Sequence, residues 1–208
     1  MKKHLFVVVI VILGIFNIIP FSFSGAVTSD GMINSTSLPL NPWALSMVQL
    51  DQAHQISEGE GIVIGLLDGG IATDVFADNL WINTDEIPDN NVDDDNNGYI
   101  DDIHGWNFYA DTNNTDDWST ISHGSTVSSI LREAAPKAKI MSLKVISSNN
   151  IIANDDVAGI AEALLYAKDN GVHIIYMPFR LSYTPTYLLD RFSELYAHNI
   201  TLIASAGQ

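Results

Sequence analysis

The sequence predicts an α/β fold in which a doubly wound parallel sheet is covered by helices on both faces. From residue 62 onward, short apolar runs rich in β-branched residues alternate with segments of helical periodicity, which is the order typical of a parallel sheet. The strand-like runs are apolar almost throughout, as in strands that are buried on both faces. The 208 residues are enough for one such domain.

The expected elements follow from these runs and from the residues that interrupt them. Strands are expected at 62–67, 139–146, 172–177 and 200–204, and helices at 43–58, 124–134 and 186–198. A further helix is expected between Asn154, a plausible N-cap, and Gly171, a plausible C′ residue. Pro136 stops the helix before it. Residues 71–122 are rich in Asp and Asn, and we expect a long acidic loop region there.

Composition excludes several classes of protein. The chain has 9 Lys and Arg against 25 Asp and Glu, a formal net charge of −16 and 47% hydrophobic residues. Such a surface repels phosphate backbones, so nucleic-acid binding is not expected. The absence of Cys excludes disulfide scaffolds, thiol catalysis and Cys-based zinc sites. The stretch from Asp68 to Asp117 holds 14 acidic residues and no Lys or Arg, so its charge must be solvated, screened or offset by cations.

The N-terminus predicts a secretory signal over residues 1–26. Lys2 and Lys3 precede an apolar run at 5–16, and small residues, among them Ser24 and Ala26, follow it. The alternative is an uncleaved anchor, although the apolar run is shorter than the roughly 20 residues that span a bilayer. We expect a secreted or cell-envelope protein, in contact with a membrane only if this segment is not cleaved. Residues 27–42 predict a loose polar lead-in.

Two residues are candidates for acid–base chemistry. Asp68 directly follows the first predicted strand, and at that edge of a parallel sheet functional side chains gather. His123 opens a predicted helix and is followed by Gly124 and Ser125. Taken singly, Asp68 could be an ordinary turn aspartate and His123 a surface or capping histidine. The sequences that flank the two residues are more informative.

Those flanks resemble segments of the subtilisin-like serine proteases. Residues 61–70 (GIVIGLLDGG) are similar to the Asp segment of that family, and 123–127 (HGSTV) to its His segment. Residues 134–140 (AAPKAKI), 205–208 (SAGQ), the lead-in 43–61 and the insert 92–108 (VDDDNNGYIDDIHGWNF) resemble other family segments in the family's order. The resemblance defines residues 43–208 as the N-terminal part of a peptidase domain.

The resemblance implies Ser-His-Asp acyl transfer on polypeptide substrates, with Asp68 orienting the imidazole of His123. The family's serine lies in a later Gly-Thr-Ser-Met-Ala segment, which this sequence does not contain. Gln208 stands at the position of the oxyanion Asn, and Pro178 lacks a main-chain N–H at the end of the substrate-binding strand. We therefore expect a partial subtilisin-like sheet, without the later strands and the serine-bearing helix, and no peptidase activity from this chain alone.

The acidic insert, at about residues 85–118, predicts a cation site. Asp93, Asp95, Asn97 and Asp101 follow the first part of a calcium-loop pattern. His104 replaces the Glu that an EF-hand needs at its twelfth position, so we expect a looser Ca²⁺ loop. A solvated Asp- and Asn-rich loop is the alternative.

The sequence is compatible with four interpretations. The chain is an incomplete or decayed serine endopeptidase (a pseudoenzyme), or one piece of a split or frameshifted peptidase. Alternatively it is a secreted acidic binding module that depends on calcium, or a non-functional gene fragment.

Overall fold

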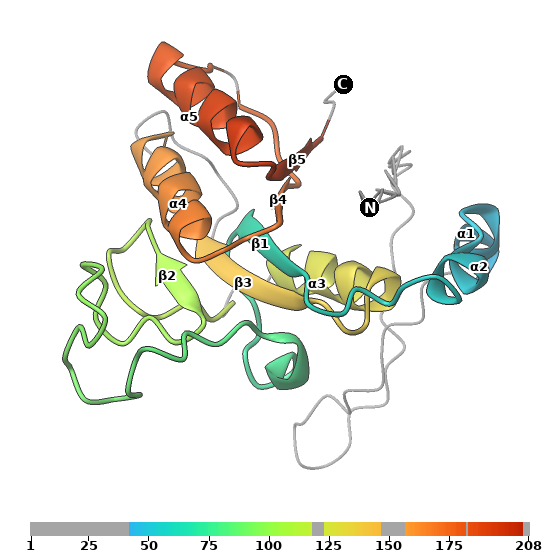
Figure 1. Ribbon diagram of the computed structural model, residues 1–208, viewed down its shortest axis with the longest axis horizontal. Coiled ribbons are helices and arrows are strands. Elements are labelled where there is room, and N and C mark those ends of the chain that lie inside the picture. The colour runs from blue at the N-terminus through green and yellow to red at the C-terminus, as the bar shows by residue number, and fades with distance from the viewer. Residues whose placement is uncertain (1–41, 118–122, 147–156, 182, 206–208) are drawn as a thin grey trace, which may run out of the picture.

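The computed structural model describes residues 42–117, 123–146, 157–181 and 183–205. Five parallel strands form one sheet in the order β2-β3-β1-β4-β5 (Figure 1). The strands are β1 (Val63–Asp68), β2 (Gly105–Asn107), β3 (Lys139–Lys144), β4 (Ile174–Met177) and β5 (Thr201–Ala204). The predicted α/β class with a parallel sheet is confirmed.

The helices fall close to the predicted positions. The structure differs from the predicted elements in two places, the first helix and strand β2. The helices are α1 (Pro42–Met47), α2 (Leu50–His54), α3 (His123–Ala134), α4 (Val157–Asp169), α5 (Thr186–Ala197) and the 3₁₀ turn η1 (Ala77–Asn79). The single helix expected at 43–58 is instead two short helices, because Gln49 adopts a left-handed φ of 55°. Strand β2 lies inside the region expected to be loop. The predictions for residues 1–41, for Asn154 and for Gln208 lie outside the described residues.

The connections wind the sheet in two directions. After β1 the chain forms β2 at one edge of the sheet and returns through α3 to β3, which lies between β2 and β1. It then crosses through α4 to β4 and through α5 to β5 on the other side of β1. The carboxyl ends of β1 and β4 therefore lie where the winding direction changes. In open α/β sheets this is the point at which ligands bind.

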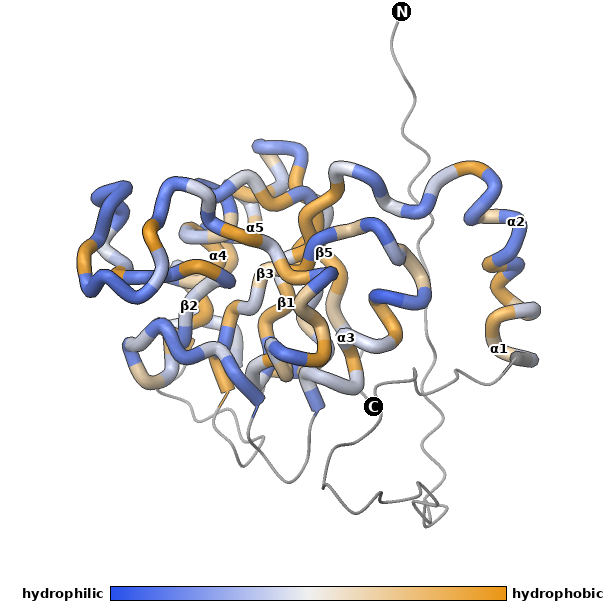
Figure 2. Tube along the Cα trace, turned by 90° about the horizontal axis from the view of Figure 1, so that it is seen from below, coloured by the Kyte–Doolittle hydropathy of each residue, from blue (hydrophilic) through white to orange (hydrophobic). Residues whose placement is uncertain are grey.

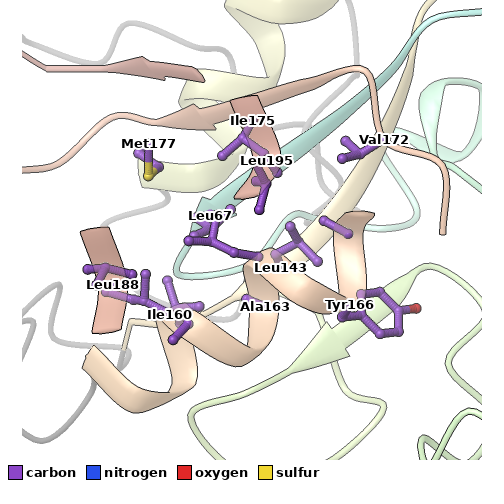
Figure 3. Close-up of a cluster of buried hydrophobic side chains, with 14 of the residues drawn as sticks. Leu67, Leu143, Ile160, Ala163, Tyr166, Val172, Ile175, Met177, Leu188 and Leu195 are labelled. Atoms are coloured by element: carbon purple, nitrogen blue, oxygen red, sulfur yellow. The ribbon is translucent and has the colours of Figure 1, made fainter. Parts of the chain in front are cut away.

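Both faces of the sheet are buried by apolar clusters. One cluster joins Leu67 and Leu143 to α4 and α5 (Figure 3). The other joins Leu66 and Ile140 to Val127 of α3. Successive residues of β1 point to opposite faces, so a fully apolar strand is needed to serve both clusters. This burial fixes the register that places Asp68 at the end of β1.

Helix α4 shows how the sequence produces this packing. Ile160, Ala163, Leu164 and Ala167 recur at helical spacing and are fully buried, and Figure 3 shows Ile160 and Ala163 in the cluster. The helix ends at Asp169, and Gly171, two residues later, has a φ of 73° that suits the left-handed C′ conformation. The prediction that Gly171 follows the end of this helix is confirmed.

An apolar groove lies beside the last strand. It has a volume of about 320 Å³, and Met177, Phe179, Phe192 and Leu202 contribute to its lining. Among the described residues, β5 pairs with β4 alone. Figure 2 shows hydrophobic segments in the central strands and long hydrophilic stretches in the loops beside β2. Within the described ranges, no helix is long and apolar enough to cross a bilayer.

Candidate functional site

Asp68 is held rigidly at the carboxyl end of β1. Its side chain is 1% exposed, and the main-chain N–H of Gly69 donates to its Oδ1 at 2.7 Å. Its own main-chain oxygen accepts hydrogen bonds from the N–H groups of Val145 and Ile146, which follow β3. The carboxylate is thus desolvated and fixed in direction, as an acid that orients a base must be.

His123 begins α3 and faces this carboxylate. Its Nδ1 lies 2.8 Å from Oδ2 and 3.0 Å from Oδ1 of Asp68. An ionised carboxylate only accepts hydrogen bonds, so Nδ1 carries the proton and Nε2 of the neutral ring keeps a lone pair. The His123 side chain is 44% exposed. The pair therefore offers a base that solvent and a substrate can reach.

The electrostatics favour the protonated ring. The hydrogen bond to Asp68 raises the pKa of His123 above its ordinary 6.5, and the negative charges of Asp68 and Asp117 act in the same direction. Partial burial of the ring opposes this rise. The site therefore stabilises the imidazolium that forms when His123 accepts a proton.

Two glycines bring the elements of the site together. A Cβ at Gly124 would lie 2.0 Å from the main-chain oxygen of Gly70, and 3.2 Å from Oδ1 of Asp68. Gly70 has a φ of 112°, and a Cβ there would lie 2.7 Å from the oxygens of Thr115 and Asp116. A larger residue at position 124 would push α3 away from the turn after β1, and one at position 70 would push residues 115–116 away from that turn.

Further polar side chains lie around the dyad. Lys144 of β3 lies opposite Asp68 of β1 in the register of the sheet. Its Nζ donates to the main-chain oxygen of Asp116 at 2.6 Å. Burial lowers the pKa of Lys144. Burial and the charge of Asp68 raise the pKa of Tyr176 on β4, so this phenol remains protonated beside the site at neutral pH.

The acidic insert contains a second cluster. One carboxylate oxygen each from Glu86, Asp95 and Asp102 lies within 4.8 Å of the others, and Glu86 and Asp102 are 6% and 0% exposed. Side-chain amides of Asn83 and Asn97 each donate to both Asp95 and Asp102 at 2.8–3.0 Å. Among the described residues, the donors that contact this cluster are neutral. The negative charge of the three close carboxylates is therefore not offset by a positively charged side chain within the described residues. Carboxylate oxygens in such a cluster are suitable ligands for a hard cation.

Of the four cation ligands predicted from the sequence, two contact this cluster and two accept hydrogen bonds elsewhere in the insert. Asp95 belongs to this cluster, and Asn97 contacts it through its amide nitrogen. Asp93 instead accepts from the N–H groups of Asn97 and Gly98, and Asp101 accepts from those of Asn90 and Asn91. Both close turns around the cluster, and the assignment of Asp93 and Asp101 as ligands stays a prediction.

The cluster is anchored to the core by α4. The Tyr166 hydroxyl donates to Oδ2 of Asp102 at 2.6 Å. Its ring contacts Tyr99 and Phe108 edge to face, with centroids 5.0 and 5.6 Å away. Burial, followed by the charge and hydrogen bond of Asp102, raises the pKa of Tyr166 strongly. The insert is therefore a folded layer that packs on the sheet domain.

The sequence analysis missed Glu86 and Asp102. It searched for ligands at every second residue, whereas Glu86 lies seven residues before that pattern and Asp102 is the second acid of an adjacent pair. The useful signal was the pairing of acids at Asp85-Glu86 and Asp101-Asp102.

Comparison with known proteins identifies relatives of this chain. The family model described as the subtilase family matches residues 59–207. "Subtilisin-like protease 1" of Plasmodium berghei (strain Anka) is 27% identical over 182 residues, which are 79% of this chain and 28% of the relative. The solved structure of a lanthipeptide protease has a TM-score of 0.55 at 19% identity, covering 79% of this chain and 44% of that one.

The family model covers more than half of the chain, so the scaffold is that of a serine peptidase, and the chain belongs to the subtilase family. It spans 28% of the length of the curated relative that it matches.

The raised pKa of His123 predicts a definite pH dependence of stability. Since the folded-state pKa lies above the ordinary 6.5, the dyad contributes stability that is fully present below pH 6.5. This stability is lost as the pH rises through the folded-state pKa. Urea unfolding of the whole chain between pH 6 and 9 should show this loss, and His123→Ala and Asp68→Asn should both abolish it. Stability of the parent chain that rises across this window would contradict the assignment.

Proposed function

We propose that this chain is the Asp- and His-bearing part of a subtilisin-like serine endopeptidase that hydrolyses polypeptides. The observation that carries the proposal is the buried Asp68 carboxylate 2.8 Å from Nδ1 of His123. This arrangement supports a general base whose second nitrogen, Nε2, takes the proton of a serine hydroxyl and later gives it to the leaving amine.

The nucleophile must come from residues outside this sequence. None of its serines lies in the family's Gly-Thr-Ser-Met-Ala surroundings. Of the serines near the dyad, Ser125 is already engaged, because its Oγ donates to Asp117 and accepts from the N–H of Ala72. In this proposal the dyad of Asp68 and His123 holds and transfers a proton. Cleavage of a peptide bond also requires a nucleophilic serine, which further sequence would supply.

The 208-residue chain should therefore show no peptidase activity of its own. Casein should not be cleaved, and a fluorophosphonate probe, which labels activated serines, should not label the chain. Among the described residues the His123 ring is hydrogen-bonded to Asp68 and to none of the serines, and no serine of the sequence stands in the family's Gly-Thr-Ser-Met-Ala segment. Labelling that His123→Ala abolishes would contradict this expectation.

Reading the gene past codon 208 tests the proposal itself. A Gly-Thr-Ser-Met-Ala segment in any frame would support a peptidase completed by further sequence, and its absence from all frames would contradict it.

We further propose that the acidic insert binds Ca²⁺ and that the protein is exported by residues 1–26. Glu86, Asp95 and Asp102 would hold the ion, and water would complete its coordination. The support is the chemistry of the donor set, three carboxylates contacted by neutral donors. Bound Ca²⁺ would supply the positive charge that offsets them, so its role here is to stabilise the insert.

Calorimetry tests the proposed Ca²⁺ site. Asp102→Asn should weaken Ca²⁺ binding by at least about tenfold, because it removes a charged ligand while keeping an acceptor for Tyr166. The matched control is Asp111→Asn, which removes an exposed charge from the same region and should leave affinity within about twofold. Equal loss in both variants would indicate a diffuse effect of the acidic surface and would refute a defined site.

A further inference from the structure

A closed ring of hydrogen bonds joins the three segments around the dyad. The N–H of Ala72 donates to Ser125 Oγ at 3.0 Å, and Ser125 donates to Asp117 Oδ2 from its hydroxyl at 3.0 Å and its N–H at 3.2 Å. The N–H of Asp117 donates to the oxygen of Ile71 at 3.2 Å, which closes the ring. The turn after Asp68 and the helix that begins with His123 are thus tied together through Asp117.

The hydrogen bonds of this ring require an acceptor oxygen at position 117. The Ser125 hydroxyl accepts from Ala72, so its hydrogen is directed to the carboxylate, which also receives the N–H of the same residue. The neighbouring Asp116 adds a parallel link, because its Oδ1 accepts from the N–H and the hydroxyl of Thr73 at 3.0 and 2.6 Å. Residues 115–117 therefore form a strap against the turn that carries Asp68.

The charge of Asp117, like that of Asp68, acts on the imidazole. This negative charge contributes to the raised pKa of His123. Among the described residues, Lys144 of β3, bonded to the oxygen of Asp116, and Tyr176 of β4 also lie beside the dyad. The charge of Asp117 thus favours the imidazolium form of His123, in which both ring nitrogens carry a proton.

We propose that Asp117 is a positioning residue for the dyad. Through Ser125 it holds the first turn of α3 against the turn after β1, and its charge stabilises the imidazolium of His123. The inference rests on the proposed function only in taking His123 as the base of the reaction.

Two kinds of variant separate the geometric part from the electrostatic part. Asp117→Asn keeps an acceptor oxygen but removes the charge, whereas Asp117→Glu keeps the charge. Ser125→Ala breaks the ring of hydrogen bonds and leaves the charge of Asp117 in place, whereas Ser125→Thr keeps a hydroxyl at this position. Asp190→Asn removes an exposed charge from α5, on the other face of the sheet, and is the matched control.

The readout is nuclear magnetic resonance of the His123 imidazole in the full chain. Asp117→Asn should lower the pKa of His123 by about 0.3–0.5 pH units, a size set by partial solvent screening. Asp117→Glu and Asp190→Asn should each shift it by less than about 0.2 units. Ser125→Ala should speed exchange of the Nδ1 proton with water at least about threefold, because an imidazole held less firmly exposes that proton more often. Ser125→Thr, which keeps the hydroxyl, should keep the slow exchange of the parent chain.

Equal titration of His123 in Asp117→Asn and Asp190→Asn would overturn the electrostatic part. Unchanged Nδ1 proton exchange in Ser125→Ala would overturn the geometric part. If Asp117→Asn fails to fold by circular dichroism, Asp117→Glu still decides, because a pKa lowered by 0.3 units or more in this charged variant contradicts the proposal. Peptidase activity enters neither measurement, so failure here and failure of the proposed function are distinguishable.

Discussion

The close approach of two backbones, at Gly70 and Gly124, is the constraint on which the rest of the site depends. Helix α3 can place His123 against a buried carboxylate only if its first turn comes within contact of the turn after β1. Gly124 leaves no room for a Cβ beside the oxygen of Gly70. The carboxylate of Asp68 is then fixed by the sheet and the imidazole by the helix, so their hydrogen bond needs little further ordering.

The two polar centres are built on different principles. The dyad lies where the winding of the sheet reverses, and buried apolar strands fix its position. The acidic cluster lies in an insert with little regular structure, and its order comes from side-chain and main-chain hydrogen bonds around Glu86, Asp95 and Asp102. Tyr166 of α4 connects this cluster to the core that also supports β1 and β3. Stabilisation of the insert by a cation would therefore also stabilise the core beneath β3.

The sequence predicted those features that depend on local pattern. The order of strands and helices and the placement of Asp68 at a strand end followed from apolar periodicity, and the pairing of Asp68 with His123 followed from the family resemblance. Strand β2 could not be predicted, because Gly-Trp-Asn has no apolar run and becomes a strand only by pairing with β3. Glu86, Asp102 and the link from Ser125 to Asp117 depend on how a long loop folds back in space, which no spacing in the sequence encodes.

If the site acts as inferred, Asp68 fixes the tautomer of His123 so that Nε2 is free to act as a base. The decisive measurement is a long-range proton–nitrogen spectrum of the imidazole, recorded above its pKa. We expect the neutral ring to carry its proton on Nδ1, and an Asp68→Ala chain to show a mixture of both tautomers. A neutral ring protonated on Nε2 in the parent chain would show that Asp68 does not fix the tautomer.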